Sequence, residues 1–138
     1  MSSVEIALKF SGILLLGLAA VQDMRERKVS NRITLPLLAA ALLSCSLHGD
    51  VGEKAFSLVL ALLLFGIWHL GWMGGADAKA LMALALAWMP AFFVATLFIA
   101  VFGIAYRLRG EKKYPGFLPI SLAATLTFIG ELSIMALN

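Results

Sequence analysis

Residues 80–106 read ALMALALAWMPAFFVATLFIAVFGIAY, and this uncharged stretch of 27 residues decides the fold. A helix rises about 1.5 Å per residue, so one continuous helix here would be about 40 Å long. That length exceeds the roughly 30 Å hydrocarbon core of a membrane. Pro90 lies inside the stretch, and a proline removes a backbone donor and clashes with the preceding turn. We therefore predict two helices that meet near Pro90, the first of them short.

The composition of the whole chain is typical of a membrane protein. Hydrophobic residues make up 62% of its 138 residues and charged residues 14%, against about 45–50% and about 25% in soluble domains. A chain this short has too little interior to bury so much apolar surface. The composition excludes a soluble globular enzyme, a disordered chain and a nucleic-acid-binding domain. The single cysteine, Cys45, excludes a disulfide framework and a cysteine-based zinc site.

Charged residues separate the remaining apolar stretches from one another. These stretches cover residues 5–23, 33–49, 55–76 and about 114–137, and the short helix before Pro90 covers about 78–89. A membrane crossing needs roughly 20 mostly apolar residues. We predict an all-α, polytopic membrane protein with six transmembrane helices, the fourth of them short. Residues 1–138 form a single integral-membrane domain in this prediction.

The placement of basic residues predicts the orientation. A break near Pro90 brings Lys79 and two basic clusters to one face of the membrane, and the clusters are Arg25, Arg27, Lys28, Arg32 and Arg107, Arg109, Lys112, Lys113. Lys and Arg accumulate on the cytosolic side of short loops. We expect this face to be cytosolic, both termini to lie outside, and the protein to be multi-pass in the cytoplasmic membrane. The first stretch lacks a basic region before it, so we expect a membrane helix there and no signal peptide.

Two carboxylates, Asp23 and Asp77, fall at this predicted cytosolic face. Asp77 could serve only as the N-cap of the short helix, and Asp23 could be a solvated loop residue. Gly74 and Gly75 precede Asp77, and two glycines suggest an opening where an extended backbone could lie alongside. Lys79 is two residues from Asp77 and faces away from it on a helix. An acid without an adjacent counter-charge at a membrane boundary is a candidate for chemistry.

Two motifs around these acids resemble those of the type IV prepilin peptidases, a family of membrane aspartyl peptidases that includes the archaeal prepilin and preflagellin peptidases. The segment Gly74-Gly-Ala-Asp-Ala-Lys-Ala-Leu81 resembles the GxGD-type motif of that family. The segment Asp23-Met-Arg-Glu-Arg-Lys-Val-Ser-Asn-Arg-Ile-Thr-Leu-Pro36 is similar to the family's first-loop segment, and Tyr114-Pro-Gly-Phe-Leu-Pro119 is a weaker third match. The chain departs from the family pattern at Ala76, where many relatives have glycine, and at Ser30, where many have proline.

The resemblance implies a function and a set of site residues. Asp23 and Asp77 would be catalytic, and the supporting motif residues would be Gly74, Gly75, Ala76, Lys79 and Asn31. The substrates would be prepilin-like precursors with class III signal peptides, and their basic leader would be removed on the cytosolic side of the bilayer. No cofactor, metal or nucleic acid is implied. The larger relatives carry a region with paired cysteines and methylate the product, so we expect cleavage without methylation here.

Two carboxyls that share one proton can supply both the base and the acid that peptide hydrolysis needs, because like charges about 3 Å apart cannot both ionise. A helix N-terminus favours an anion and a helix C-terminus disfavours one. From this we predict that Asp77 is the resting base and that Asp23 carries the proton.

Two other functions fit the residues as well. A small proton-coupled transporter could use Asp77 and Glu131, the carboxylate inside the last stretch, and a proton-flux assay in liposomes would detect it. A non-catalytic subunit of a membrane complex would need neither Asp23 nor Asp77. We expect Glu131 to be a structural hydrogen-bonding group, and Asn31 or Thr34 to cap the second helix.

Overall fold

The computed structural model describes residues 2–26, 28–47, 49–110 and 116–137. This part of the chain forms six α-helices and no strand, which confirms the all-α prediction. The helices are α1 (Ser3–Glu26), α2 (Asn31–Leu47), α3 (Val51–His69), α4 (Gly75–Ala87), α5 (Met89–Leu108) and α6 (Phe117–Leu137). The predicted basic residues 27, 112 and 113 and the first two residues of the third motif, 114 and 115, lie outside the described residues.

Four of these helices, α1, α3, α5 and α6, are long and apolar enough to cross a membrane. Helix α2 is apolar but has 17 residues, and α4 has 13. At about 1.5 Å per residue α4 is roughly 20 Å long, which is shorter than the hydrocarbon core. The architecture is that of a multi-pass membrane protein, whereas six crossings and the position of the termini stay predictions.

The chain breaks next to Pro90, as the sequence predicts. Helix α4 ends at Ala87, Trp88 takes up a non-helical conformation (φ −158°, ψ 80°), and α5 begins at Met89 with Pro90 in its first turn. A proline is tolerated there because the N–H groups of a first helical turn have no partner inside the helix. The uncharged stretch therefore forms two helices.

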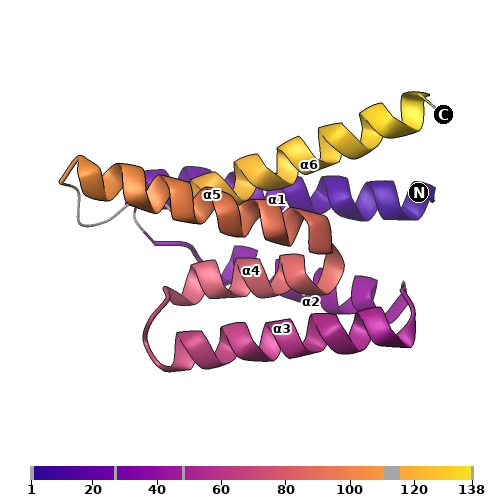
Figure 1. Ribbon diagram of the computed structural model, residues 1–138, viewed down its shortest axis with the longest axis horizontal. Helices are drawn as coiled ribbons and strands as arrows, with labels where there is room; N and C mark the ends of the chain where they lie inside the picture. Colours follow the sequence, from indigo (N-terminus) through magenta and orange to yellow (C-terminus); the bar gives the residue numbers. More distant parts are fainter. Residues whose placement is uncertain (1, 27, 48, 111–115, 138) are drawn as a thin grey trace.

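The short helix α4 lies at the centre of the bundle. It packs against α2, α3 and α5, and α1 packs against α6 and α2 (Figure 1). Ala78 and every residue from 80 to 86 are buried. These residues are alanine, leucine and one methionine, so the helix from residue 80 to residue 86 has no polar face and is surrounded on all sides.

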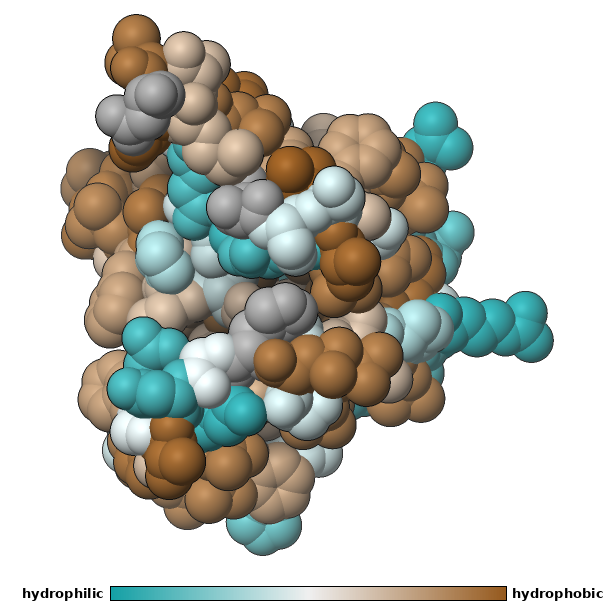
Figure 2. Space-filling model, turned by 90° about the vertical axis from the view of Figure 1, so that its right-hand side faces the viewer, coloured by the Kyte–Doolittle hydropathy of each residue, from teal (hydrophilic) through white to brown (hydrophobic). Residues whose placement is uncertain are grey.

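The bundle has two distinct ends. The N- and C-termini lie at the same end, which we call the termini end (Figure 1). The opposite end holds the last turn of α1 and the first turns of α2, α4 and α6, and it carries Asp23 and Asp77, so we call it the Asp end. Figure 2 looks onto the termini end, where hydrophilic residues lie among apolar ones.

Candidate active site

Asp23 and Asp77 reach the Asp end from two helices that run in opposite directions. Asp23 lies in the last turn of α1, and Asp77 is the third residue of α4. Both residues are partly buried. The Gln22 side chain accepts a hydrogen bond from the Ser30 backbone N–H (3.0 Å), which ties the start of α2 to the end of α1 beside Asp23.

The start of α6 contacts both acids. The backbone N–H of Phe117 donates to Oδ2 of Asp23 at 3.3 Å. The preceding residue, Gly116, lies directly against Asp77: a Cβ at this glycine would be 2.6 Å from Oδ1 and 2.5 Å from Oδ2 of that carboxyl group. Gly116 and Phe117, which are neighbours in the chain, thus each contact one of the two carboxyls, so both acids lie near the start of α6.

The protonation of Asp77 follows from this environment. Asp77 begins α4, outside the four helices long enough to cross a membrane. Burial raises the pKa of Asp77 from 3.8 to about 6, and the negative charge of Asp23 contributes to the rise. A desolvated carboxyl next to a like charge favours its neutral form. Asp77 therefore keeps its proton to a higher pH than an ordinary aspartic acid.

The raised pKa of Asp77 opposes the effect expected from the helix dipole, and the catalytic roles of the two acids stay a prediction. The prediction made Asp77 the anion because it begins a helix, but burial and the charge of Asp23 act in the opposite direction. The Phe117 N–H donates to Asp23, and such a donor suits an ionised carboxylate. Nor is Asp77 the N-cap of α4, since Gly74 occupies that position. The capping alternative for Asp77 is therefore wrong.

The two glycines before Asp77 leave room for close neighbours and need no unusual backbone conformation. Gly74 has an ordinary φ of −63°, and a Cβ there would be 3.3 Å from Oδ2 of Asp77. A Cβ on Gly75 would be 3.0 Å from Nε1 of Trp68. The Trp68 indole thus covers one side of the glycine pair, where the sequence suggested an opening.

The other motif residues form a separate contact at the same end. Nζ of Lys79 donates to Oδ1 of Asn31 at 2.7 Å and so links α4 to the start of α2. Ala76 is half-buried and packs against the core. The structure brings Lys79 to Asn31 and does not pair it with Asp77.

The prediction that Asn31 or Thr34 caps α2 is wrong. The hydroxyl of Ser30 accepts the backbone N–H of Arg32 at 3.2 Å, so Ser30 caps this helix. Thr34 is 1% exposed, and its hydroxyl has no partner within the described part of the chain.

Gly116 and Phe117 are site residues to which the sequence analysis assigned no role. Both belong to the third motif, Tyr114–Pro119, which that analysis quoted as a weak resemblance. A glycine between a proline and an aromatic residue before a helix was the available signal. Their role depends on contacts 39 and 94 positions away in the chain, to Asp77 and Asp23.

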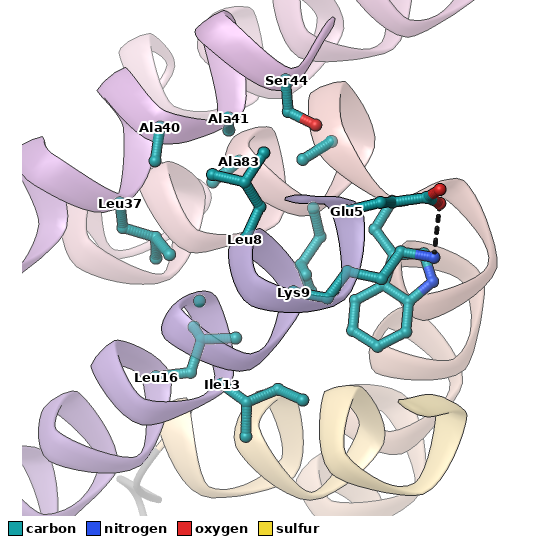
Figure 3. A pocket seen from close by; sticks show the side chains of 14 residues that line it. Glu5, Leu8, Lys9, Ile13, Leu16, Leu37, Ala40, Ala41, Ser44 and Ala83 are labelled. Carbon is teal, nitrogen blue, oxygen red and sulfur yellow. Dashed lines mark ion pairs between the residues drawn. The ribbon is translucent and has the colours of Figure 1, made fainter. Parts of the chain in front are cut away.

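Two cavities of the described structure lie toward the termini end. An apolar pocket of about 90 Å³ lies between α1 and α2, and the ion pair of Glu5 and Lys9 is at its rim (Figure 3). A larger cavity of about 390 Å³ adjoins it and shares Glu5, Lys9 and Trp88 as lining residues. Neither includes Asp23 or Asp77. We place the candidate site at the Asp end nevertheless, because Glu5 and Glu131, which line the larger cavity, are both paired with Lys9.

Glu131 is one of the charged residues that line the larger cavity. It accepts a hydrogen bond from Nζ of Lys9 at 2.7 Å and from Nε1 of Trp88 at 2.8 Å. Nζ of Lys9 is also 3.2 Å from Glu5 and lies over the Trp88 ring, 4.9 Å from its centroid. The hydrogen bonding predicted for Glu131 is present, and its purely structural role stays a prediction. Within the described ranges, no three His, Cys, Asp or Glu side chains are grouped to hold a metal ion.

The chain matches the model of a known protein family. Residues 10–108 match the model of the type IV leader peptidase family. This range contains both Asp23 and Asp77 and ends before Gly116. Searches of curated proteins and of solved structures gave no match. Since the matched range covers more than half of the chain, the protein belongs to the type IV leader peptidase family.

Proposed function

We propose that the protein is an aspartic endopeptidase that removes the basic leader from prepilin- or preflagellin-like precursors, with Asp23 and Asp77 as its catalytic residues. The observation that carries this proposal is the meeting of the two carboxyls at the start of α6. One carboxyl accepts a backbone N–H, and the other is buried beside it with a raised pKa. Membership of a leader peptidase family supports a proteolytic role for this pair.

Hydrolysis by this pair needs no other group. The ionised Asp23 takes a proton from a water molecule, whose oxygen attacks the scissile carbonyl carbon, while protonated Asp77 gives its proton to the carbonyl oxygen. The C–N bond then breaks as Asp23 passes its proton to the leaving nitrogen. Asp77 recovers a proton from the diol, which becomes the new carboxyl group. Each acid ends in the protonation state in which it began.

The position of the pair suits the substrate. A prepilin-like precursor joins a basic, cytosolic leader to an apolar membrane helix, and its scissile bond lies at that junction. We place the Asp end on the cytosolic side and both termini outside. The basic residues of the Asp end that the structure describes, such as Arg25 and Arg109, agree with the distribution expected of cytosolic loops. The acid pair then lies at the depth of the junction.

The test is cleavage of a tagged prepilin by the detergent-solubilised protein, followed by N-terminal sequencing of the product. We expect cleavage by the unchanged protein and at least a 10³-fold loss for Asp23→Asn and for Asp77→Asn, roughly the effect of removing one member of a catalytic unit. Glu26→Gln removes a neighbouring exposed acid of α1 and is the matched control. Cleavage that survives both Asp substitutions would exclude the proposal, and proton flux in liposomes would then favour transport.

The same product tests for methylation. Cys45 is the only cysteine of the helices described here, so these helices hold no paired-cysteine site. We expect the new N-terminus to have the mass of an unmodified amine when the methyl donor S-adenosylmethionine is supplied. A product heavier by one methyl group would show that the protein also transfers methyl groups.

A further inference from the structure

The first turn of α6 is deeply buried at the Asp end. Phe117 and Ile120 are 0% exposed, and Pro119 is also fully buried. The packing of these apolar side chains in the core thus fixes the backbone at the start of this helix. A group held by such contacts keeps its position while a neighbouring side chain rotates.

Gly116 limits where the Asp77 carboxyl can lie. Measured from the Cβ that any other residue would place there, Oδ2, Oδ1 and Cγ of Asp77 are 2.5, 2.6 and 2.7 Å away. Real Cβ atoms essentially never approach other atoms so closely. Gly74 lies on another side of the same carboxyl, 3.3 Å from Oδ2 by the same measure. A methyl group at residue 116 would therefore displace the Asp77 side chain.

Phe117 holds the other acid through its backbone. As the first residue of α6 it has an N–H group without a partner inside the helix. This N–H donates to Oδ2 of Asp23. The Asp23 carboxyl therefore satisfies this helix-terminal donor, and the hydrogen bond fixes one oxygen of Asp23 at the same time.

From these contacts we propose that Gly116 and Phe117 are positioning residues that set the separation of the two catalytic carboxyls. This inference rests on the proposed function. It adds a third element to the site, at the start of α6, beyond the range 10–108 that matches the family. The two residues act through Asp23 and Asp77 and touch no substrate in this proposal.

Gly116→Ala tests the contact with Asp77, and Gly130→Ala is its matched control. Gly130 lies inside α6, the helix that Gly116 precedes, and a Cβ there would meet nothing within 4 Å. We expect Gly116→Ala to lower kcat for prepilin cleavage roughly 10²-fold, the scale of a 1 Å misplacement, with KM changed less than about threefold since no substrate contact is lost. A displaced Asp77 carboxyl lies farther from the negative charge of Asp23, so the pKa of Asp77 falls. The alkaline limb of the pH–kcat profile should then move to lower pH. Equal kcat values and superimposable pH profiles for the two variants would overturn the proposal.

Phe117→Pro and Phe117→Ala test the contact with Asp23 and decide the question if Gly116→Ala does not fold. Both variants lose the buried ring, but only proline also loses the N–H, and a proline is tolerated at the first position of a helix. We expect kcat of Phe117→Pro to be at least tenfold below that of Phe117→Ala. Equal kcat values would overturn the role of this N–H.

Asp23→Asn and Asp77→Asn are measured alongside these variants. If they keep full cleavage, the proposed function itself fails. If they abolish cleavage while the variants at residues 116 and 117 keep the kcat of their controls, the positioning role alone is wrong.

Discussion

The two ends of the bundle hold carboxylates in opposite ways. At the termini end, Glu5 and Glu131 lie 3.2 and 2.7 Å from Nζ of Lys9, which is 12% exposed. Trp88 donates to the second oxygen of Glu131. Each described acid of this network therefore has a cationic or N–H partner.

At the Asp end, Asp23 has a single backbone N–H as its described donor, and Asp77 has a raised pKa caused by burial and by Asp23. The nearest lysine in sequence, Lys79, is bonded to Asn31. A partnered acid is fixed in one charge state, whereas a buried acid next to a like charge can exchange its proton near neutral pH. The partners of an acid thus distinguish a structural role from a chemical one.

The largest effect on stability is expected at the termini end. Lys9→Met leaves Glu5 and Glu131 without their cation in a partly buried site, and this should lower the free energy of unfolding by about 3 kcal/mol. SDS-induced unfolding in mixed micelles measures the change. Cleavage per folded molecule should stay within twofold, because the network contacts neither Asp23 nor Asp77.

The control for Lys9→Met is the double variant Lys9→Met, Glu131→Gln. Neutralising Glu131 removes one of the unpaired charges, so part of the lost stability should return. If Lys9→Met instead abolished cleavage by a folded protein, the two ends would be coupled and the comparison would not hold.

The next largest effect on the free energy of unfolding is expected for Trp88→Phe. It keeps an aromatic ring against Phe128 (6.1 Å between ring centroids) but removes the donor to Oε1 of Glu131. A hydrogen bond to a charged group contributes about 1.5–3 kcal/mol, so we expect a loss near 2 kcal/mol by the same SDS titration. Wild-type stability for this variant would show that the network does not depend on the indole N–H.

The pH dependence of stability probes the Asp end. The pKa of Asp77 is raised to about 6 in the folded protein and is near 3.8 when unfolded, so the unfolded state loses the proton first. The stability from protonated Asp77 is fully present below pH 3.8 and is lost as the pH rises through about 6. Between pH 5 and pH 8 the unfolding free energy should fall by about 1.4 kcal/mol from this group.

Asp77→Asn is the variant that isolates this contribution. Asparagine does not titrate, so the fall between pH 5 and pH 8 should shrink by the share that Asp77 contributes. An identical pH dependence in both proteins would mean that Asp77 has an ordinary pKa and would remove the physical basis for its role as proton donor.

The sequence predicted local features well and long-range ones poorly. The break at Pro90 follows from the covalent chemistry of one residue, and the length of α4 follows from the break. The protonation of Asp77 depends on burial and on Asp23, 54 positions away, so a rule based on the helix dipole alone predicted the wrong sign. The contact of Gly116 with Asp77 depends on how α6 packs, which no local pattern encodes.

The smallest effect is expected for Lys79→Met, and it bears most directly on the comparison. The Lys79–Asn31 hydrogen bond is exposed, and an exposed charged contact contributes about 0.5 kcal/mol. We expect a stability change of that size and cleavage within twofold of wild type, measured as initial rates on the tagged prepilin. Asn31→Ala removes the same bond from the other side, and its effect should not add to that of Lys79→Met. If Lys79→Met lowered cleavage tenfold or more while Asn31→Ala did not, the lysine charge itself would act on the acid pair. The Asp end would then have a counter-charge after all, and the absence of one could no longer explain why Asp77 exchanges its proton.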